Sequence, residues 1–390
     1  MIKVFKKFKR FKGLRNRMQI DNNQQVFFAL LRGGLWGQEV CLSKYREFDF
    51  SVIMRMAEEQ SVVGLITAGL EQVTDVKIPQ EWTLQFIGQT LQIEQRNRAM
   101  NEFVSRLIEK LRKEDVYAIL VKGQGIAQCY ERPLWRSCGD VDLFLSDGNY
   151  QKAKEILLPM ASSIEEEDSI EKHLGFIINS WTVELHGTLR SRCLGRMDEI
   201  IDEAQRDVFY GGNVRSWTND NVQIFLPAPN EDVFFVFTHI IKHFFHGGIG
   251  LRQICDWCRL LWIYRDSLNH GLLEQRIRNA GLMTEWKSFS ALAVDYLGIQ
   301  KNAIPLYSPG RKWSKKAEKV LKIILETGNF GHNVDRSYIV ESGKLKRKLT
   351  TLWRVVEESV RNFRVFPIDS IRVWFNLFRK GLGVLVKGQR

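Results

Sequence analysis

The sequence of 390 residues has no long apolar run and no clustered cysteine framework. No apolar stretch approaches the roughly 20 residues that a helix needs to span a bilayer, and the N-terminus lacks the apolar segment of a signal peptide. The six cysteines are scattered, which argues for a reducing compartment. Cys255 and Cys258 form a CxxC without a second pair, and we interpret them as thiols in a helix core. We therefore expect a cytoplasmic protein that is soluble or lies on the inner face of a membrane.

The body of the chain also has no excess of basic residues, although the net charge is +12. Residues 1–20 carry eight Lys and Arg and no acid, and residues 341–390 carry twelve Lys and Arg against four acids. The other 320 residues are therefore acidic by four charges. A nucleic-acid-binding fold usually presents a basic surface, so we expect no specific nucleic-acid binding.

The hydrophobic pattern predicts helices, then a small α/β unit, then helices again. Apolar residues recur at helical spacing through residues 24–113. The runs 117–121 and 141–145 are short and apolar, as buried strands are, and a short helix is expected after each. Residues 176–186 alternate like a hairpin that turns at Asn179-Ser180.

From Asn230 onward the pattern is helical. Asn230 is the expected N-cap and Gly247-Gly248 the expected end of the first of these helices. The changes in pattern divide the chain into five expected parts: a basic amphipathic tail (1–20), an N-terminal helical region (21–113), an α/β core (114–228), a helical substrate-side domain (229–305) and a basic C-terminal helical extension (306–390).

Two aspartates lie one residue apart at one end of the second predicted strand. Asp140 and Asp142 project from the same face of the strand, while Val141 points to the core. Like charges raise each other's pKa, and Mg²⁺ relieves such repulsion because it takes carboxylate oxygens together with substrate phosphates. An isolated DxD in a solvated turn is the alternative. Replacing either aspartate with Asn should leave the melting temperature unchanged or raise it.

The neighbouring segments favour a metal site over a solvated turn. Lys122-Gly123-Gln124-Gly125 joins a strand to a helix, where backbone amides and a helix N-terminus can receive a phosphate. Glu184 lies within an apolar strand, where a carboxylate is rarely placed for packing. Three carboxylates on strands beside a phosphate-binding turn predict a two-metal site for phosphoryl transfer.

This arrangement resembles the nucleotidyltransferase superfamily with the DNA polymerase β-like fold. It is still more similar to a group of bacterial nucleotidyltransferase-like proteins that are often associated with polysaccharide biosynthesis. The resemblance covers roughly residues 25–300. Its ordered motifs appear here as LVKG (120–123), Tyr130, RSCGDVDLFL (136–145), VELHG (183–187), HIIKH (239–243) and Asp256.

The resemblance implies an α+β fold, in which a small polymerase β-like mixed sheet with helices is flanked by N-terminal and C-terminal helical regions. It also implies two Mg²⁺ ions, held by Asp140, Asp142 and Glu184, and an NTP as substrate. Glu184 would bridge a metal or act as general base. Lys122, Gly123 and Gln124 would form the nucleotide-binding turn, in which Lys122 and Gly123 contact the phosphates. Where the superfamily has Gly-Ser or Gly-Gly in the phosphate turn, this chain has Gly123-Gln124, so Gln124 alters that turn.

Several further residues are candidates for the substrate side of the site. Arg136 is expected to reach a phosphate or to pair with the two aspartates. His186 lies on the same strand face as Glu184 and either orients a metal ligand or is structural.

The predicted helix 231–246 carries His239, Lys242, His243 and His246 on one face. We expect Lys242 and His243 to face the cleft and meet phosphate or acceptor. A zinc site of the HxxxH type is the alternative, but it lacks an obvious third ligand. Asp256 is expected to hydrogen-bond one of these histidines.

Both basic ends have the pattern of amphipathic helices that lie on anionic lipid. Basic residues surround the apolar positions in each case. The apolar positions are Val4, Phe5, Phe8 and Phe11 at one end, and Ile371, Trp374, Phe375, Phe378, Leu382 and Leu385 at the other. A disordered tail and a helix that packs on the body are the alternatives.

Taken together, these features favour a Mg²⁺-dependent nucleotidyltransferase that moves a nucleotidyl group from an NTP to an acceptor hydroxyl or phosphate. The resemblance places this reaction in surface-polysaccharide biosynthesis, with a glycan or a lipid-linked sugar as possible acceptor. Two other functions remain open: a non-catalytic nucleotide-binding or regulatory protein with the same fold, and a toxin-like nucleotidyltransferase that acts on RNA or protein.

Overall fold

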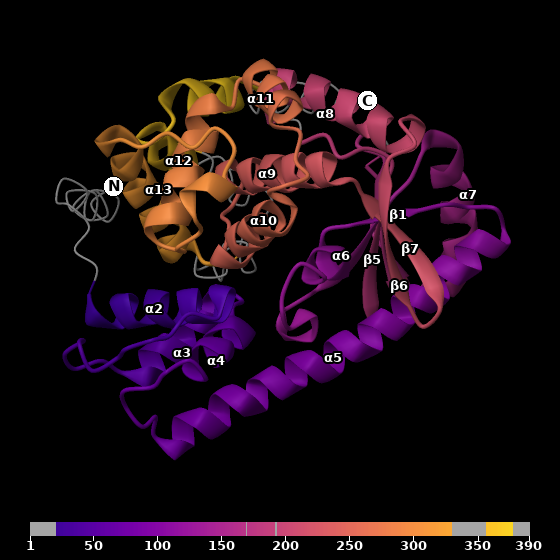
Figure 1. Ribbon diagram of the computed structural model, residues 1–390. Coiled ribbons are helices and arrows are strands. Elements are labelled where there is room, and N and C mark those ends of the chain that lie inside the picture. Colours follow the sequence, from indigo (N-terminus) through magenta and orange to yellow (C-terminus); the bar gives the residue numbers. More distant parts are fainter. Residues whose placement is uncertain (1–20, 169, 192, 330–355, 377–390) are drawn as a thin grey trace, which may run out of the picture.

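The computed structural model describes residues 21–168, 170–191, 193–329 and 356–376. It confirms the expected fold class, because one mixed sheet with helices on both faces is joined to helical regions at both ends (Figure 1). The N-terminal region is helical throughout, as its periodicity predicts. Its helices are α2 (Asn22–Trp36), α3 (Phe50–Glu59), α4 (Val63–Leu70) and α5 (Gln80–Lys113).

The sheet has seven strands in the order β3-β4-β5-β2-β1-β7-β6. β2 runs parallel to β5 and β1 parallel to β7, whereas the other neighbouring pairs are antiparallel. The strands are β1 (Ile119–Val121), β2 (Asp140–Phe144), β3 (Ser163–Ile164), β4 (His173–Ile178), β5 (Trp181–His186), β6 (Val214–Asn219) and β7 (Val222–Pro227).

The hairpin of β4 and β5 turns where the sequence predicts. Asn179 and Ser180 both have positive φ, at 49° and 68°, which is the geometry of the two-residue turn that suits the twist of a hairpin. A second hairpin, β6–β7, was not predicted. Its turn residues, Asp220 and Asn221, also have positive φ.

The two faces of the sheet differ in chemistry. Alternate residues such as Leu120, Val141, Val183 and Leu185 are buried on one face, against apolar residues of α5 and of α7 (Asp147–Leu157). The opposite face is apolar where Phe144 packs on α8 (Gly195–Tyr210) and α9 (Pro229–Phe245). Beyond that contact, the same face carries the polar residues of the candidate site.

The helical second half begins two residues before the predicted N-cap. Ala228 is the N-cap of α9 and Pro229 its first residue, because proline is well suited to the first helical turn. Asn230 instead exchanges hydrogen bonds with Asn269, at 3.0 Å each. As expected, α9 ends just before Gly247-Gly248.

The remaining helices complete the second half of the chain. Cys255 and Cys258 are buried free thiols within α10, as predicted. No helix among the described residues is long and apolar enough to cross a membrane. The helices not yet named are α6 (Gly123–Ala127), α10 (Leu251–Tyr264), α11 (His270–Asn279), α12 (Met283–Asp295), α13 (Arg311–Thr327), the short η2 (Pro133–Trp135), η3 (Leu158–Met160) and η4 (Lys301–Ala303), and the stretches 356–363 and 367–376.

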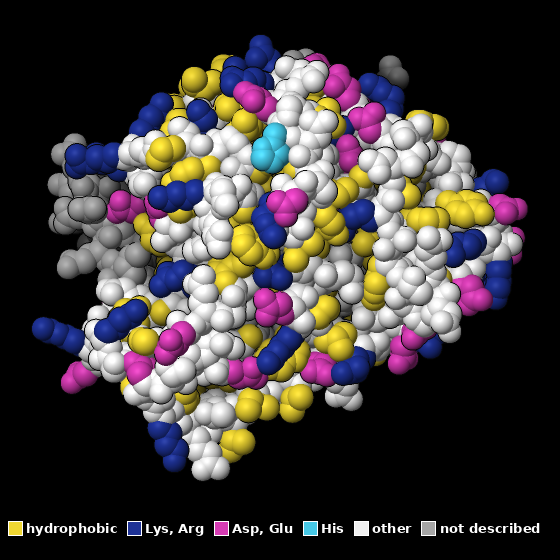
Figure 2. Space-filling view, viewed as in Figure 1, with side chains coloured by type: hydrophobic (Ala, Val, Ile, Leu, Met, Phe, Trp, Pro, Cys, Tyr) yellow, Lys and Arg dark blue, Asp and Glu magenta, His cyan; other side chains and the backbone are white. Residues whose placement is uncertain are grey.

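α5 connects the N-terminal helices to the sheet (Figure 1). Its N-terminal part packs on α4 and its C-terminal part on β6 and β7. α9 and α10 lie between the sheet and the helices α12 and α13, so α9 forms a wall over one face of the sheet (Figure 1). On the face that Figure 2 shows, basic and acidic side chains are interspersed, as the near-neutral charge of the body predicts.

Candidate active site

The strand register brings the three predicted carboxylates together. Asp142 on β2 lies directly beside Glu184 on the parallel strand β5, and Asp140 lies two residues away on the same face. One carboxylate oxygen from each of the three lies within 4.8 Å of the others. The core residues Val141 and Val183 between them are fully buried on the opposite face, which fixes this orientation.

Asp142 is the most enclosed of the three and already has two partners. Its Oδ1 accepts hydrogen bonds from Lys122 Nζ and from His186 Nε2, both at 2.7 Å. Burial opposes its ionisation, but the charge of Lys122 and the hydrogen bond from His186 outweigh burial and lower the pKa of Asp142. Lys122 is half-buried, and this burial opposes its charge. The charges of Asp142, Glu184 and Asp140 outweigh that burial and raise its pKa.

Asp140 is in the opposite electrostatic situation. The negative charge of Asp142, followed by burial, raises the pKa of Asp140 to about 6. The negative charges of Asp140 and Asp142 are therefore not neutralised equally, because Lys122 hydrogen-bonds Asp142. A divalent cation would supply the positive charge that Asp140 lacks.

Glu184 is held by two histidines. His173 Nε2 lies 3.2 Å and His186 Nε2 lies 3.4 Å from Glu184 Oε2. Burial opposes the ionisation of Glu184, but these hydrogen bonds and the charge of Lys122 lower its pKa. In turn, the hydrogen bond with Glu184 raises the pKa of His173.

A cavity of about 150 Å³ opens over the three carboxylates. Helix α9 closes one side of it with Val236, His239 and His243. The two imidazole rings are 4.3 Å apart between centroids. Burial, followed by the charge of Lys122, lowers the pKa of His239 well below its ordinary value and that of His243 to about 3. Both histidines are therefore neutral near pH 7.

The turn between β1 and α6, together with the residue before β2, completes the cavity. Lys122 and Gly123 line it, and both have positive φ, at 57° and 40°. Gly139 also lines it, and a Cβ added there would meet no atom within 4 Å, so the backbone before Asp140 is open to the cavity. We note that α6, which follows the turn, has only five residues.

Some predicted site residues lie elsewhere. The Gln124 side chain is buried and donates to Asn97 Oδ1 at 2.9 Å, so it points toward α5 and does not line the cavity. Lys242 is half-buried on α9 and is likewise not among the lining residues. Of Lys242 and His243, which were both expected to face the cleft, His243 alone lines the cavity.

Arg136 does line the cavity but pairs with a different acid from the one expected. Its Nε and Nη2 each donate to Asp256 at 2.7 Å, in place of the predicted pairing with Asp140 or Asp142. Tyr130 donates to the same carboxylate at 2.8 Å. Asp256, which was expected beside a histidine, thus connects α10 to the loop before β2. Three motif positions of the resemblance meet in this buried contact.

Two residues of the site were missed from the sequence. His173 could have been found from the predicted turn at 179–180, because a two-residue turn pairs residue 178 with 181 and hence residue 173 with His186. Arg252 of α10 lines the cavity beside Asp140, and its Nη1 donates to Ser137 O at 2.9 Å. No pattern in the sequence singles out Arg252.

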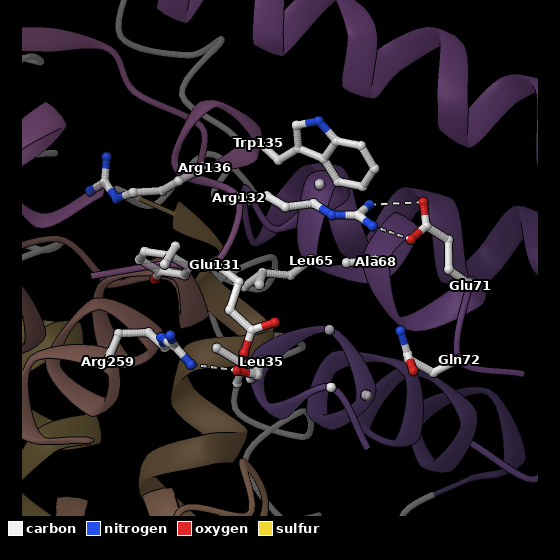
Figure 3. Close-up of a pocket in the computed structure, with 15 residues that line it drawn as sticks. Leu35, Leu65, Ala68, Glu71, Gln72, Glu131, Arg132, Trp135, Arg136 and Arg259 are labelled. Atoms are coloured by element: carbon white, nitrogen blue, oxygen red, sulfur yellow. Dashed lines mark hydrogen bonds and ion pairs between the residues drawn. The ribbon is translucent and has the colours of Figure 1, made fainter. Parts of the chain in front are cut away.

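A second, smaller cavity of about 60 Å³ lies between α2, α4 and the segment after α6. Figure 3 shows Arg132 on its wall, with the guanidinium paired to Glu71 at 2.6 and 2.8 Å. Arg259 on the opposite side donates to Leu35 O at 2.7 Å. These contacts fasten the N-terminal helices to the rest of the molecule.

Comparison with known protein families agrees with the geometry of the site. A family model described as "uncharacterised nucleotidyltransferase" matches residues 46–298, well over half of the chain. The matched segment includes every residue of the cavity over the three carboxylates. No curated protein and no solved structure matches the chain.

Proposed function

Because this chain belongs to the uncharacterised nucleotidyltransferase family, we propose that it is a Mg²⁺-dependent enzyme that transfers a nucleotidyl group from an NTP to an acceptor hydroxyl or phosphate. The observation that carries the proposal is the convergence of Asp140, Asp142 and Glu184 in one cavity beside Lys122. A nucleotide substrate is implied by the family. The metal, the mechanism and the acceptor are our inference.

The donor set fits Mg²⁺. All three groups are carboxylates, the hard oxygen ligands that Mg²⁺ takes together with substrate phosphates, at about 2.1 Å from the ion. Ligand atoms around one such ion lie up to about 4 Å apart, close to the 4.8 Å within which these oxygens already lie. Bound at this position, one or two Mg²⁺ ions would neutralise phosphate charge as it develops during transfer.

In the proposed reaction the acceptor oxygen forms a bond to the α-phosphorus, and the bond from that phosphorus to the β-phosphate oxygen breaks. Pyrophosphate leaves with the bonding electrons. A hydroxyl acceptor gives its proton to water, whereas the attacking oxygen of a phosphate acceptor carries none. Lys122 and the Gly123 backbone lie where they can meet the phosphates. The lowered pKa of Glu184 makes it a weak base, which favours a role as metal ligand over a role as general base.

The wall formed by α9 suits the acceptor. His243 and His239 are neutral, so each imidazole retains a ring nitrogen that can accept a hydrogen bond from a hydroxyl. We propose that His243 orients the acceptor, whereas Lys242 acts only through its charge. Arg252 is a further candidate for a phosphate contact, since it lines the cavity beside Asp140.

We infer the biological setting, surface-polysaccharide assembly, from the sequence resemblance alone. A location on an anionic membrane agrees with it. In the described part of the C-terminal extension, Ile371, Trp374 and Phe375 are exposed, as large apolar residues rarely are in a cluster. The N-terminal tail and residues 377–390, which carry the rest of the predicted amphipathic pattern, lie outside the described residues.

One observation favours a second candidate function, a non-catalytic nucleotide-binding protein. Lys122 Nζ donates a hydrogen bond to Asp142 Oδ1, the same atom that His186 bonds. The ammonium therefore supplies part of the positive charge that a metal ion would supply. If this contact persists when nucleotide binds, the protein binds NTP without turning it over.

Incubation with each NTP labelled at the α-phosphate, in Mg²⁺ and a glycan or lipid-linked sugar fraction, distinguishes the two candidates. We expect the wild type to move label into the fraction and to release pyrophosphate, and Asp140→Asn to do neither. Asp266→Asn is the matched control, because the Asp266 side chain is 86% exposed at the end of α10. NTP binding without label transfer or pyrophosphate release in any fraction would support the non-catalytic alternative.

A further inference from the structure

A second group of possible metal ligands adjoins the carboxylate site. It consists of His173, Glu184 and His186, whose ligand atoms lie within 4.8 Å of one another. His173 and His186 are directly paired across β4 and β5, and Glu184 lies on the same strand face. Both Nε2 atoms lie near Glu184 Oε2, at 3.2 Å from His173 and 3.4 Å from His186, and His186 Nε2 is also hydrogen-bonded to Asp142 Oδ1 at 2.7 Å.

The chemistry of this group differs from that of the three carboxylates. Two of its three donors are imidazole nitrogens, which suit zinc and other transition metals better than Mg²⁺. Zinc sites with two histidines and one glutamate keep a fourth position for water or substrate. Two of the donors are also accessible, because the His173 and Glu184 side chains are 31% and 26% exposed, whereas His186 is buried.

The spacing of the donors fits a tetrahedral ion. With metal–ligand distances of about 2.0–2.1 Å, two ligands on a tetrahedral zinc ion are roughly 3.3 Å apart. The two nitrogen–oxygen separations here are 3.2 and 3.4 Å. The same distances also suit hydrogen bonds, so the competing explanation is that the histidines only hold the Glu184 carboxylate in place.

We propose that His173, Glu184 and His186 form a binding site for a divalent transition metal, next to the Mg²⁺ site and sharing Glu184 with it. The site goes beyond the proposed nucleotidyl transfer, since its donor set selects a different class of metal. Only Glu184 belongs to both sites. Because His186 also bonds Asp142 of the Mg²⁺ site, His173 and Asp140 are the residues whose replacement tests one site without the other.

The test is a calorimetric titration of the metal-free protein with Zn²⁺ alone. We expect the tightest zinc site of the wild type to be weakened at least tenfold in His173→Gln and in His186→Gln, whereas weaker zinc binding at the three carboxylates is a separate event. His270→Gln, at an exposed position of α11, is the matched control and should bind Zn²⁺ as the wild type does. Equal zinc affinity in wild type and His173→Gln would overturn the proposal, and so would the absence of zinc binding.

A second measurement does not depend on the folding of the variants. X-ray absorption by the zinc-loaded wild type should show two imidazole nitrogens at about 2.0–2.1 Å. A shell without imidazole would contradict the proposal. Asp140→Asn should keep this zinc shell while losing Mg²⁺-dependent NTP binding. If zinc binding fails but Mg²⁺-dependent NTP binding persists in the wild type, only the transition-metal site is refuted, and the proposed function stands.

Discussion

Asp140 and Asp142 lie one residue apart, yet their pKa values move in opposite directions. Asp142 is bonded by Lys122 and His186, which lower its pKa, whereas Asp140 faces the charge of Asp142 and has a pKa of about 6. Without a cation, the ionised form of Asp140 is therefore unfavourable in the folded protein. A cation at this position would bind where the folded chain already lacks positive charge.

Replacing Asp140 should stabilise the metal-free protein above pH 6. The pKa of Asp140 is raised from 3.8 to about 6, so the folded state holds this proton more tightly than the unfolded state does. Stability is then lost as pH rises from about 4 to about 6, by at most about 3 kcal/mol, and stays lost at higher pH. Urea unfolding of Asp140→Asn at pH 8 should give a higher free energy of unfolding than the wild type, with the difference vanishing near pH 4. A lower value at pH 8 would contradict the assigned electrostatics.

The structure changes the stability that the sequence alone predicts for an Asp142 variant. Two adjacent carboxylates predict that either replacement is neutral or stabilising, but the structure shows that the buried Asp142 carboxylate is paired with the half-buried Lys122 ammonium. Asp142→Asn should therefore destabilise the protein by about 2 kcal/mol, because the Lys122 ammonium loses its charged partner. Urea unfolding of Asp142→Asn, Lys122→Met and the double variant measures the coupling. Additive losses in the double variant would show that the two side chains are not coupled.

The convergence of the three carboxylates could be predicted from the sequence because strand periodicity and motif order are local. Asp140, Asp142 and Glu184 all lie where their spacing predicts. The partners of Arg136 and Gln124 could not be predicted, since they depend on how α10 and α5 pack against the sheet. Sequence spacing determines which face a side chain is on, but not which distant helix it meets.

At the level of elements, α2 and α4 pack with almost no space between their backbones. A Cβ added at Gly69 would lie 1.9 Å from the Leu30 carbonyl oxygen, and one added at Gly34 would lie 1.9 Å from the Leu65 carbonyl oxygen. These atoms belong to helix backbones and cannot rotate away. The glycines therefore set the distance between the two helices.

Gly69→Ala should destabilise the protein by about 3 kcal/mol or more, because the two helices must move apart. Gly88→Ala on α5 is the matched control, as no atom lies within 4 Å of its added Cβ. That control should be stabilising by about 1 kcal/mol, the difference in helix propensity. Thermal melts of both variants provide the check, and a Gly69→Ala variant as stable as the wild type would contradict the close packing.

The periodicity of the sequence predicted whether a segment is a helix or a strand more reliably than it predicted the first and last residues of that segment. The hairpin at 179–180 was predicted because its strands alternate clearly. β6–β7 was missed although it also has a two-residue turn, because β6 alternates only between exposed and half-buried positions. The start of α9 was placed two residues late, because Asn230, a good N-cap residue, bonds Asn269 instead.

On the scale of the whole molecule, the basic charge is concentrated in different parts of the chain from the candidate site. The body is acidic by four charges, whereas the two ends are basic. The site lies between the sheet and α9, remote in sequence from either end. The expected division into five parts remains a prediction, which limited proteolysis near residues 113, 228 and 305 would test.

If the ends bind a membrane, the protein should bind vesicles with anionic lipid and bind neutral vesicles much less. Binding should weaken with salt, because the Debye length falls from about 10 Å at 0.1 M to about 3 Å at 1 M. Deleting residues 1–17, which removes eight positive charges, should lower vesicle binding in a sedimentation assay without changing NTP binding.

Phe375→Ser tests the apolar part of the same surface. Leu84→Ser is the matched control, since Leu84 is also exposed but lies on α5. Only Phe375→Ser should reduce vesicle binding. Equal binding of the wild type to neutral and anionic vesicles would mean that the basic ends serve a different partner.

The most direct test of the central claim is calorimetric titration of the metal-free wild type with each NTP, in the presence and absence of Mg²⁺. The account predicts that at least one NTP binds only when Mg²⁺ is present. It also predicts that Asp140→Asn loses this binding while remaining folded, and that Asp266→Asn retains it. NTP binding that is equally tight without Mg²⁺, or unchanged in Asp140→Asn, would contradict the assignment of Asp140, Asp142 and Glu184 as the metal site.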